Sequence, residues 1–242
     1  MTFNEFNLKD LLQKAIDEAG FKEPSPIQEQ AIPFVLDGRD IVGQAHTGTG
    51  KTAAFGLPIL NKMKGNSGVE AVVIVPTREL AMQVSDELYR FGRFLGINTA
   101  TVYGGQAYAR QIKLIENAGI IVATPGRFLD LLRGGKIDIK PDYVILDEAD
   151  EMLDMGFLDD IKEIFTFLPT ERQTLLFSAT MPVAIKIFNL EVLNALIASS
   201  LCLCSISPWR PFAINPWETI NVDNLSTSFL VLQKIIDLLG FL

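Results

Sequence analysis

The sequence predicts an α/β domain in which a doubly wound, mostly parallel sheet carries helices on both faces. Short apolar runs that do not alternate with polar residues recur along the chain, at residues 71–75, 99–103, 120–123, 143–146 and 174–177. Such runs indicate strands buried on both faces, which is typical of a parallel sheet covered by helices. An earlier apolar pair, Ile41-Val42, enters a glycine-rich turn, and unusual polar motifs follow the later runs. Because ligands of such sheets bind beyond the carboxyl ends of the strands, we expect the functional site at that edge.

The helices of this domain are expected between the apolar runs and ahead of the first one. Apolar side chains recur at helical spacing from Leu8 to Ala19, and Gly20 follows as a stop signal. A second helix is predicted from Pro26 to the turn at Asp37-Gly38. Longer helical stretches at residues 79–95 and 157–168 separate later strands. Strand and helix therefore alternate with the regularity of a doubly wound domain.

Length and composition set limits on the class of protein. A chain of 242 residues with 48% apolar content can bury a full core and forms one large domain or one and a half. Its net charge of −8 gives no general attraction for nucleic acid, so any such binding requires a local patch or a partner domain. Cys202 and Cys204 suit neither a metal site nor a disulfide framework, and residues 1–10 carry no export signal. We therefore expect a cytoplasmic protein.

Residues 45–52 have the composition of a phosphate-binding loop. Glycines at 48 and 50 allow backbone angles closed to other residues, so that amide groups can point into a concavity at a helix N-terminus. Lys51 would then reach the terminal phosphates of a nucleotide, and the Thr52 hydroxyl would hold Mg²⁺. Ala45 stands where the general pattern has its first glycine. The alternative is a glycine-rich turn that caps an ordinary helix.

An acidic pair, Asp147-Glu148, follows the apolar run at 143–146 and supplies what a phosphate loop lacks. Asp147 would anchor Mg²⁺ through its water shell, and Glu148 would orient or deprotonate an attacking water molecule. Alternatively, these acids only occupy the first turn of a helix, where the helix dipole favours them. The acidic pair together with Lys51 and Thr52 favours a nucleotide-hydrolysing site.

Seven motifs, in order, resemble those of the DEAD-box helicases. Asp147-Glu148-Ala149-Asp150 matches the motif that names the family, and residues 45–52 resemble its phosphate loop, Ala45 included. The stretch from Gly20 to Gln28 resembles the family's Q motif, with Phe3 as the upstream aromatic residue. The other four are PTRELA at 76–81, the pair Gly104-Gly105, TPGR at 124–127 and SAT at 178–180. The resemblance covers residues 3 to about 182 and implies the first, RecA-like P-loop NTPase domain of the family.

This resemblance implies an ATP-dependent RNA helicase with ATP and Mg²⁺ as cofactors. It implies catalytic roles for Lys51, Asp147 and Glu148, with Mg²⁺ held at Thr52 and Asp147 through water. Gln28 would hydrogen-bond the adenine, whereas without the family it would be an ordinary surface helix residue. The implied nucleotide-binding residues are Phe3, Phe21, Gln28, Ala45, His46, Thr47, Gly48, Thr49, Gly50, Lys51 and Thr52. His46 stands where the family usually has Gln, and we assign it no separate role.

The resemblance further implies a coupling group and an RNA-binding group. Ser178 and Thr180 would contact Asp150 and link the nucleotide state to the RNA. The implied RNA backbone contacts are Pro76, Thr77, Arg78, Gly105, Thr124, Pro125, Gly126 and Arg127. Alternatively, Thr124-Pro125 only caps a helix and Arg127 belongs to a solvated face. Contacts to the backbone do not read bases, so binding would be independent of RNA sequence.

The expected organisation is a Q-motif region at 1–30, an ATP-binding RecA-like domain at 31–182 and a divergent or truncated tail at 183–242. We expect the second helicase domain of the family to be missing from this chain. A second domain or a protein partner would then complete the helicase, and this chain alone would hydrolyse little ATP. Three interpretations of the tail remain open: a frame-disrupted product, a divergent cap on the sheet, or a membrane segment at 192–209. We favour the first, and expect no membrane partner. The functional alternatives are a non-catalytic half-helicase that binds nucleotide, RNA or protein, and a P-loop ATPase that acts on DNA.

Overall fold

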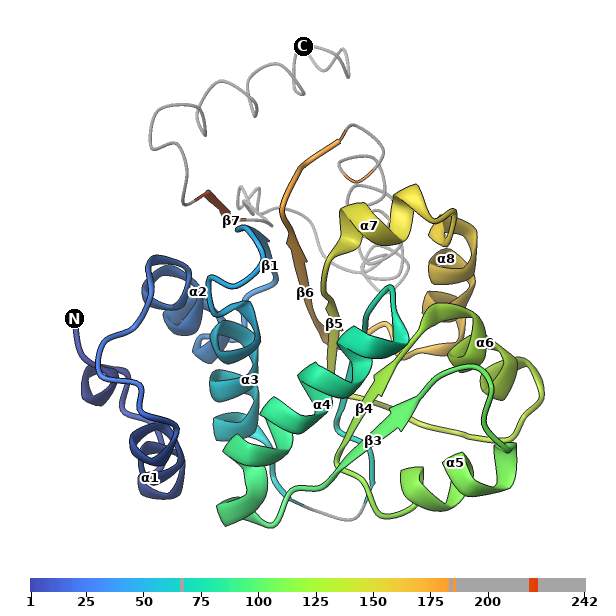
Figure 1. Cartoon of the computed structure of the whole chain (residues 1–242), viewed down its shortest axis with the longest axis horizontal. Coiled ribbons are helices and arrows are strands. Elements are labelled where there is room, and N and C mark those ends of the chain that lie inside the picture. The colour runs from blue at the N-terminus through green and yellow to red at the C-terminus, as the bar shows by residue number, and fades with distance from the viewer. Residues whose placement is uncertain (66–67, 183–184, 186–217, 222–242) are drawn as a thin grey trace, which may run out of the picture.

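The protein is built around one parallel sheet, as the sequence predicts. The structure, a computed structural model, describes residues 1–65, 68–182, 185 and 218–221 (Figure 1). The strand order is β3-β4-β2-β5-β6-β1-β7, and every pair of neighbours runs parallel. The strands are β1 (Ile41–Gln44), β2 (Ala71–Ile74), β3 (Thr99–Val102), β4 (Ile120–Ala123), β5 (Tyr143–Leu146), β6 (Gln173–Ser178) and β7 (Glu218–Asn221).

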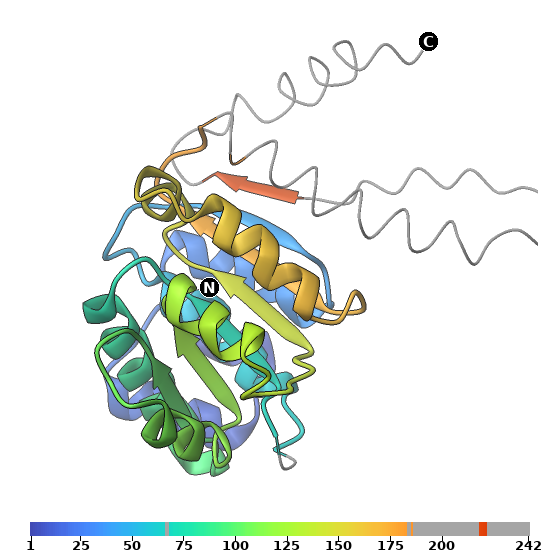
Figure 2. The same ribbon diagram turned by 90° about the vertical axis from the view of Figure 1, so that its right-hand side faces the viewer.

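Helices cover both faces of this sheet, and each face has its own apolar cluster. Side chains of successive strand residues point to opposite faces. In β2, Val73 therefore packs with α1, α2, α3 and α4, whereas Val72 and Ile74 pack on the side of α5, α6, α7 and α8. Figures 1 and 2 show these helices on either side of the sheet. The helices are α1 (Asp10–Ala19), α2 (Pro26–Leu36), α3 (Lys51–Lys62), α4 (Arg78–Gly92), α5 (Tyr108–Ile115), α6 (Pro125–Arg133), α7 (Ala149–Asp154) and α8 (Leu158–Phe167). The doubly wound fold class is confirmed.

Two stretches differ from the sequence-based expectation. The predicted helix at 79–95 ends as an α-helix at Gly92, and a single turn of 3-10 helix, η2 (Arg93–Leu95), follows it. Gly96 then adopts a left-handed conformation with φ 70°, which stops the helix. At the N-terminus, an unpredicted 3-10 turn, η1 (Phe3–Phe6), buries Phe3 and Phe6. A turn this short leaves little periodic signal in a sequence.

The tail lies mostly outside the described residues. One described segment of the tail, β7, pairs with the sheet. Its Glu218 aligns with Ile41 of β1 in a parallel register. The three interpretations of the tail, the interval 192–209 and both cysteines fall on undescribed residues. Among the residues that the structure does describe, no helix has the length and apolarity needed to cross a membrane.

Candidate functional site

The phosphate loop connects β1 to α3 and is shaped by two glycines. Gly48 and Gly50 have φ of 82° and 87°, in the left-handed region that favours glycine. A Cβ atom on Gly50 would lie 2.3 Å from Nε2 of Gln28, so no larger residue fits there without displacing that side chain. The loop is held by the hydroxyl of Ser25, which donates to the Thr49 carbonyl at 2.7 Å. The loop is therefore preformed, with Lys51 opening the helix behind it.

Lys51 is a buried cation that has no hydrogen-bond partner among the residues that the structure describes. Its side chain is 5% exposed, and its Nζ lies 3.7 Å from both Asp147 Oδ1 and Glu148 Oε1, beyond hydrogen-bonding distance. Buried polar groups are normally satisfied, and a buried ammonium carries three donors. The expected convergence of the phosphate loop and the acidic strand end is therefore found, and it leaves a cation ready to donate to further oxygen atoms.

The two acids differ in environment. Asp147 follows β5 and is almost fully buried. Burial raises its pKa to about 6, the Lys51 charge opposes that rise and the Glu148 charge adds to it. Glu148 has a left-handed backbone, with φ 57° and ψ 50°, a conformation that costs a non-glycine residue about 1–2 kcal/mol. Its Oε1 accepts a hydrogen bond from the Thr47 hydroxyl at 3.2 Å, so this backbone turn directs the carboxylate at the phosphate loop.

Gln28 is not the surface helix residue that its sequence context alone suggests, because it is only 3% exposed. As the third residue of α2 it completes a capping box, accepting a hydrogen bond from the Ser25 amide at 2.9 Å. Its Nε2 donates to the Gly50 carbonyl at 3.0 Å. Phe3 stacks on Phe21 nearby, with ring centroids 6.1 Å apart. Gln28 therefore ties the helix start to the phosphate loop.

A cavity of about 750 Å³ opens beside the phosphate loop and is lined by six of the predicted nucleotide-binding residues. These are Phe21, Thr47, Gly48, Gly50, Lys51 and Thr52, joined by both acids of the pair. Phe3 instead lines a smaller adjoining hollow of about 380 Å³, which shares Phe21. The wall contributed by α4 was missed by sequence reasoning and includes Gln83, Asp86, Glu87 and Arg90. Their i, i+3, i+4, i+7 spacing was the available signal, because it places polar side chains on one face of the helix that follows β2.

The predicted coupling residues contact one another. Oδ2 of Asp150 accepts hydrogen bonds from the amide and hydroxyl of Thr180, both at 2.8 Å. The Asp150 amide donates to the Ser178 hydroxyl at 3.2 Å. Partial burial raises the pKa of Asp150, but the hydrogen bonds from Thr180 and Ser178 outweigh it and leave the pKa below its usual value. The start of α7 is therefore fastened to the end of β6.

The residues predicted to contact RNA lie beyond the ends of β2, β3 and β4. Thr77 caps α4 by accepting a hydrogen bond from the Leu80 amide, and Thr124-Pro125 begins α6. The exposed Arg78 extends over the ring of Tyr103, with 5.3 Å from its guanidinium carbon to the ring centroid. Gly105 is exposed and has φ 86°. Pro76 is buried, so its side chain supports this surface from below.

Arg127 does not belong to a freely solvated face. Its guanidinium donates to the Gln106 carbonyl at 2.7 Å and to Oε1 of Gln111 at 3.0 Å. It also stacks on Tyr108, at 4.3 Å from the ring centroid. A guanidinium has five N–H donors, so these bonds fix Arg127 and leave donors for an external oxygen.

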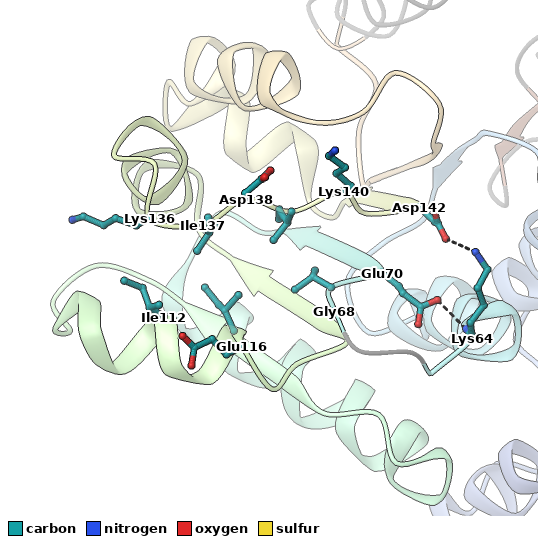
Figure 3. A pocket seen from close by; sticks show the side chains of 13 residues that line it. Lys64, Gly68, Glu70, Ile112, Glu116, Lys136, Ile137, Asp138, Lys140 and Asp142 are labelled. Atoms are coloured by element: carbon teal, nitrogen blue, oxygen red, sulfur yellow. Dashed lines mark hydrogen bonds and ion pairs between the residues drawn. The ribbon is translucent and has the colours of Figure 1, made fainter.

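Another cavity, of about 630 Å³, lies at the opposite, amino-terminal ends of the strands (Figure 3). Glu70 and Asp142, which precede β2 and β5, line it together with Lys64. The Lys64 amide donates a hydrogen bond to the Glu70 carboxylate at 2.9 Å, and the Lys64 Nζ forms an ion pair with Asp142 at 3.2 Å. Lys64 therefore links the two acids. This cavity contains none of the predicted site residues.

A parallel sheet, a glycine-rich loop before a helix and an acidic strand end beside the loop lysine define a P-loop nucleotide-binding domain. The sequence matches of this chain are more specific. Residues 25–188 match the DEAD/DEAH box helicase family, and the chain belongs to that family.

Relatives and solved structures agree with this assignment. The chain is 58% identical over 187 residues to the "DEAD-box ATP-dependent RNA helicase RhpA" of Helicobacter pylori, and 52% identical over 189 residues to the "DEAD-box ATP-dependent RNA helicase CshA" of Bacillus subtilis. These matches cover 76% and 77% of this chain but only 38% of each relative. A DEAD box protein from Methanococcus jannaschii superimposes with a TM-score of 0.74 at 46% identity, covering 78% of this chain and 52% of the other.

Proposed function

We propose that this chain is the nucleotide-binding domain of a DEAD-box RNA helicase, which binds ATP with Mg²⁺ and couples ATP hydrolysis to RNA binding and duplex unwinding. The observation that carries the proposal is the buried ammonium of Lys51, which has no hydrogen-bond partner in the described part of the chain and lies 3.7 Å from two carboxylates at the mouth of a preformed phosphate loop. Phosphate oxygens would satisfy this ammonium, and the cavity beside it holds about 750 Å³.

The residues of the cavity fit a magnesium nucleotide. The amides of the phosphate loop and Lys51 would bind the terminal phosphates, while Thr52 and, through water, Asp147 would hold Mg²⁺. No group of three His, Cys, Asp or Glu side chains in the described part of the chain forms a metal cluster. Mg²⁺ binds with few protein ligands and keeps waters and phosphate oxygens, so Thr52 and Asp147 would be sufficient to hold it. The bound metal would neutralise charge that develops on the transferred phosphoryl group.

Glu148 is the proposed general base. Its strained backbone directs the carboxylate toward the loop, where it would orient the attacking water and accept its proton. Lys51 keeps positive charge beside this carboxylate, at 3.7 Å. Asp147 must ionise to bind the hydrated metal, and the positive charge of a bound metal would favour ionisation despite burial.

Adenine recognition would fall to Gln28, supported by Phe3 and Phe21. Each end of its amide already makes one hydrogen bond within the protein. A side-chain amide offers two donors and two acceptor positions, so one of each remains for the donor and acceptor of the adenine N6 and N7 edge. A guanine presents acceptors at both positions, which supports a preference for ATP.

The RNA would bind along the carboxyl ends of β2, β3 and β4, beside Arg78, Gly105 and the start of α6. The fastening of Asp150 by Ser178 and Thr180 would couple this surface to the nucleotide site, because Asp150 is two residues from Glu148. Family membership also supports a cytoplasmic location and cooperation with a second helicase domain. The relatives from Helicobacter pylori and Bacillus subtilis are named ATP-dependent RNA helicases, and we extend that activity to this chain.

The experiment is a comparison of phosphate release from ATP with no nucleic acid, with single-stranded RNA and with single-stranded DNA of the same sequence. We expect Mg²⁺-dependent release that RNA stimulates more than DNA, and loss of that release in Glu148→Gln. Glu171→Gln removes an exposed acid elsewhere and serves as the control. Equal release by Glu148→Gln and the unmodified chain would remove Glu148 from the proposed role, and better stimulation by DNA would favour a DNA-dependent ATPase.

A further inference from the structure

We propose that Glu87 of α4 is a positioning residue that holds the Thr52 hydroxyl in the orientation needed to ligate Mg²⁺. The inference deepens the proposed function and rests on it. None of the recognised motifs contains Glu87, and its place on the polar face of α4 does not by itself identify Thr52 as its neighbour. The structure brings the two residues together through a close contact between α3 and α4.

That contact is made possible by two glycines. A Cβ atom on Gly56 of α3 would lie 2.5 Å from Cδ2 of Leu88 on α4. A Cβ atom on Gly92 of α4 would lie 3.1 Å from Cδ2 of Leu60 on α3. Residues 52, 56 and 60 follow each other at intervals of four and therefore share one face of α3. Consequently α4 packs directly on the face of α3 that carries Thr52.

Glu87 precedes Leu88 in this contact and reaches Thr52. Both side chains line the 750 Å³ cavity together with Asp147 and Glu148, and the nearby Thr52 hydroxyl opposes the rise that burial causes in the pKa of Glu87. Glu87 is half-buried, whereas its neighbour Asp86 lines the same cavity but is exposed. Arg90, three residues further along α4, also lines the cavity.

The chemistry of a hydroxyl ligand explains why such an acceptor matters. A threonine hydroxyl has one O–H donor and two lone pairs. When a lone pair is given to a cation, the hydrogen must point away from the metal and toward an acceptor. A carboxylate that accepts this hydrogen fixes the rotamer of the hydroxyl and increases its basicity. Glu87 would therefore act on Mg²⁺ only through Thr52. Loss of Glu87 should weaken the binding of Mg²⁺ more than the binding of the nucleotide.

The test measures binding of the fluorescent nucleotide mant-ADP to the full 242-residue chain, with Mg²⁺ and with EDTA. The ratio of the two affinities reports the metal contribution without requiring turnover. We expect Glu87→Ala to lower this ratio about 10-fold, the lower end of the usual effect of removing the partner of a metal ligand. Glu87→Gln keeps an acceptor for the Thr52 hydroxyl and should retain most of the ratio. Asp86→Ala removes a negative charge from the same cavity and should leave the ratio unchanged.

A double-mutant comparison separates positioning from structural damage. In a Thr52→Ala background, Glu87→Ala should cause no further loss of the ratio, because the hydroxyl that it orients is gone. Thermal unfolding of each variant checks the fold. The inference is overturned if Glu87→Ala and Asp86→Ala give the same ratio, or if the Glu87→Ala effect persists without the Thr52 hydroxyl. Absence of Mg²⁺-dependent binding by the unmodified chain would instead refute the proposed function and the inference with it.

Discussion

The ammonium of Lys51 and the carboxylate of Asp147 lie 3.7 Å apart, with side chains only 5% and 3% exposed. Lys51 begins the helix after β1 and Asp147 follows β5, and β6 lies between these strands in the sheet. The carboxyl ends of parallel strands meet at one edge, which is why groups from separate strands converge there.

Replacing Lys51 by Met should weaken nucleotide binding while the chain still folds. A charge-assisted hydrogen bond contributes about 1.5–3 kcal/mol, so affinity should fall by about 10- to 100-fold. Titration with mant-ADP and Mg²⁺ measures the loss. Lys140→Met, which makes the same change at the opposite end of the strands, should bind as the unmodified chain does. Unchanged binding by Lys51→Met would contradict the assigned role.

Asp147 should make the metal-free chain less stable as the pH rises. Its pKa is raised to about 6 in the folded state, above the ordinary carboxyl value near 4, so the folded chain binds the extra proton between these values. The stabilisation is complete below pH 4 and is lost as the pH rises through 6. Between pH 5 and pH 7 the loss is about 1 kcal/mol. Urea unfolding in EDTA should show this slope in the unmodified chain relative to Asp147→Asn, and parallel pH profiles would contradict it.

Gln28→Ala should reduce both stability and nucleotide selectivity. The substitution leaves the Ser25 amide and the Gly50 carbonyl without their side-chain partner, which costs about 1–3 kcal/mol when such groups stay buried. The preference for ATP over GTP should also decline, as measured by competition against mant-ADP. Gln30→Ala in the same helix is the matched control. Full retention of the ATP preference by Gln28→Ala would exclude adenine recognition by this side chain.

Arg78→Ala should weaken RNA binding without destabilising the chain, because Arg78 is exposed. Loss of one phosphate contact lowers the salt dependence of the binding constant by about one unit on a log-log plot. Fluorescence anisotropy of a labelled single-stranded RNA over a range of salt concentrations measures this slope. Arg93→Ala, which disrupts the surface pair with Glu18, should leave the slope intact. A uniform slope across both variants would remove Arg78 from the RNA surface.

Much of the fold could be predicted because the burial of a strand constrains the residue types within that strand. The apolar runs matched β2, β4, β5 and β6, which are buried along their whole length, whereas β3 at the edge of the sheet alternates buried and half-buried residues. Glycine spacing likewise predicted the phosphate loop, because positive φ at 48 and 50 is a local backbone requirement. The short turn at η1 and the break at Gly92 were missed, because one helical turn contains too few residues for a periodic pattern.

The sequence by itself determined the order of the motifs and the edge of the sheet at which they would meet. Tertiary structure alone decided the contacts between elements: the burial of Gln28 against the Gly50 carbonyl, the distance from Lys51 to Asp147, and the approach of Glu87 to Thr52. The physical reason is that periodicity reports which face of an element is buried, whereas a contact depends on how closely two elements pack. In this protein that closeness is set by glycines at positions 50 and 56, where a single Cβ atom would fill the space between the neighbouring elements.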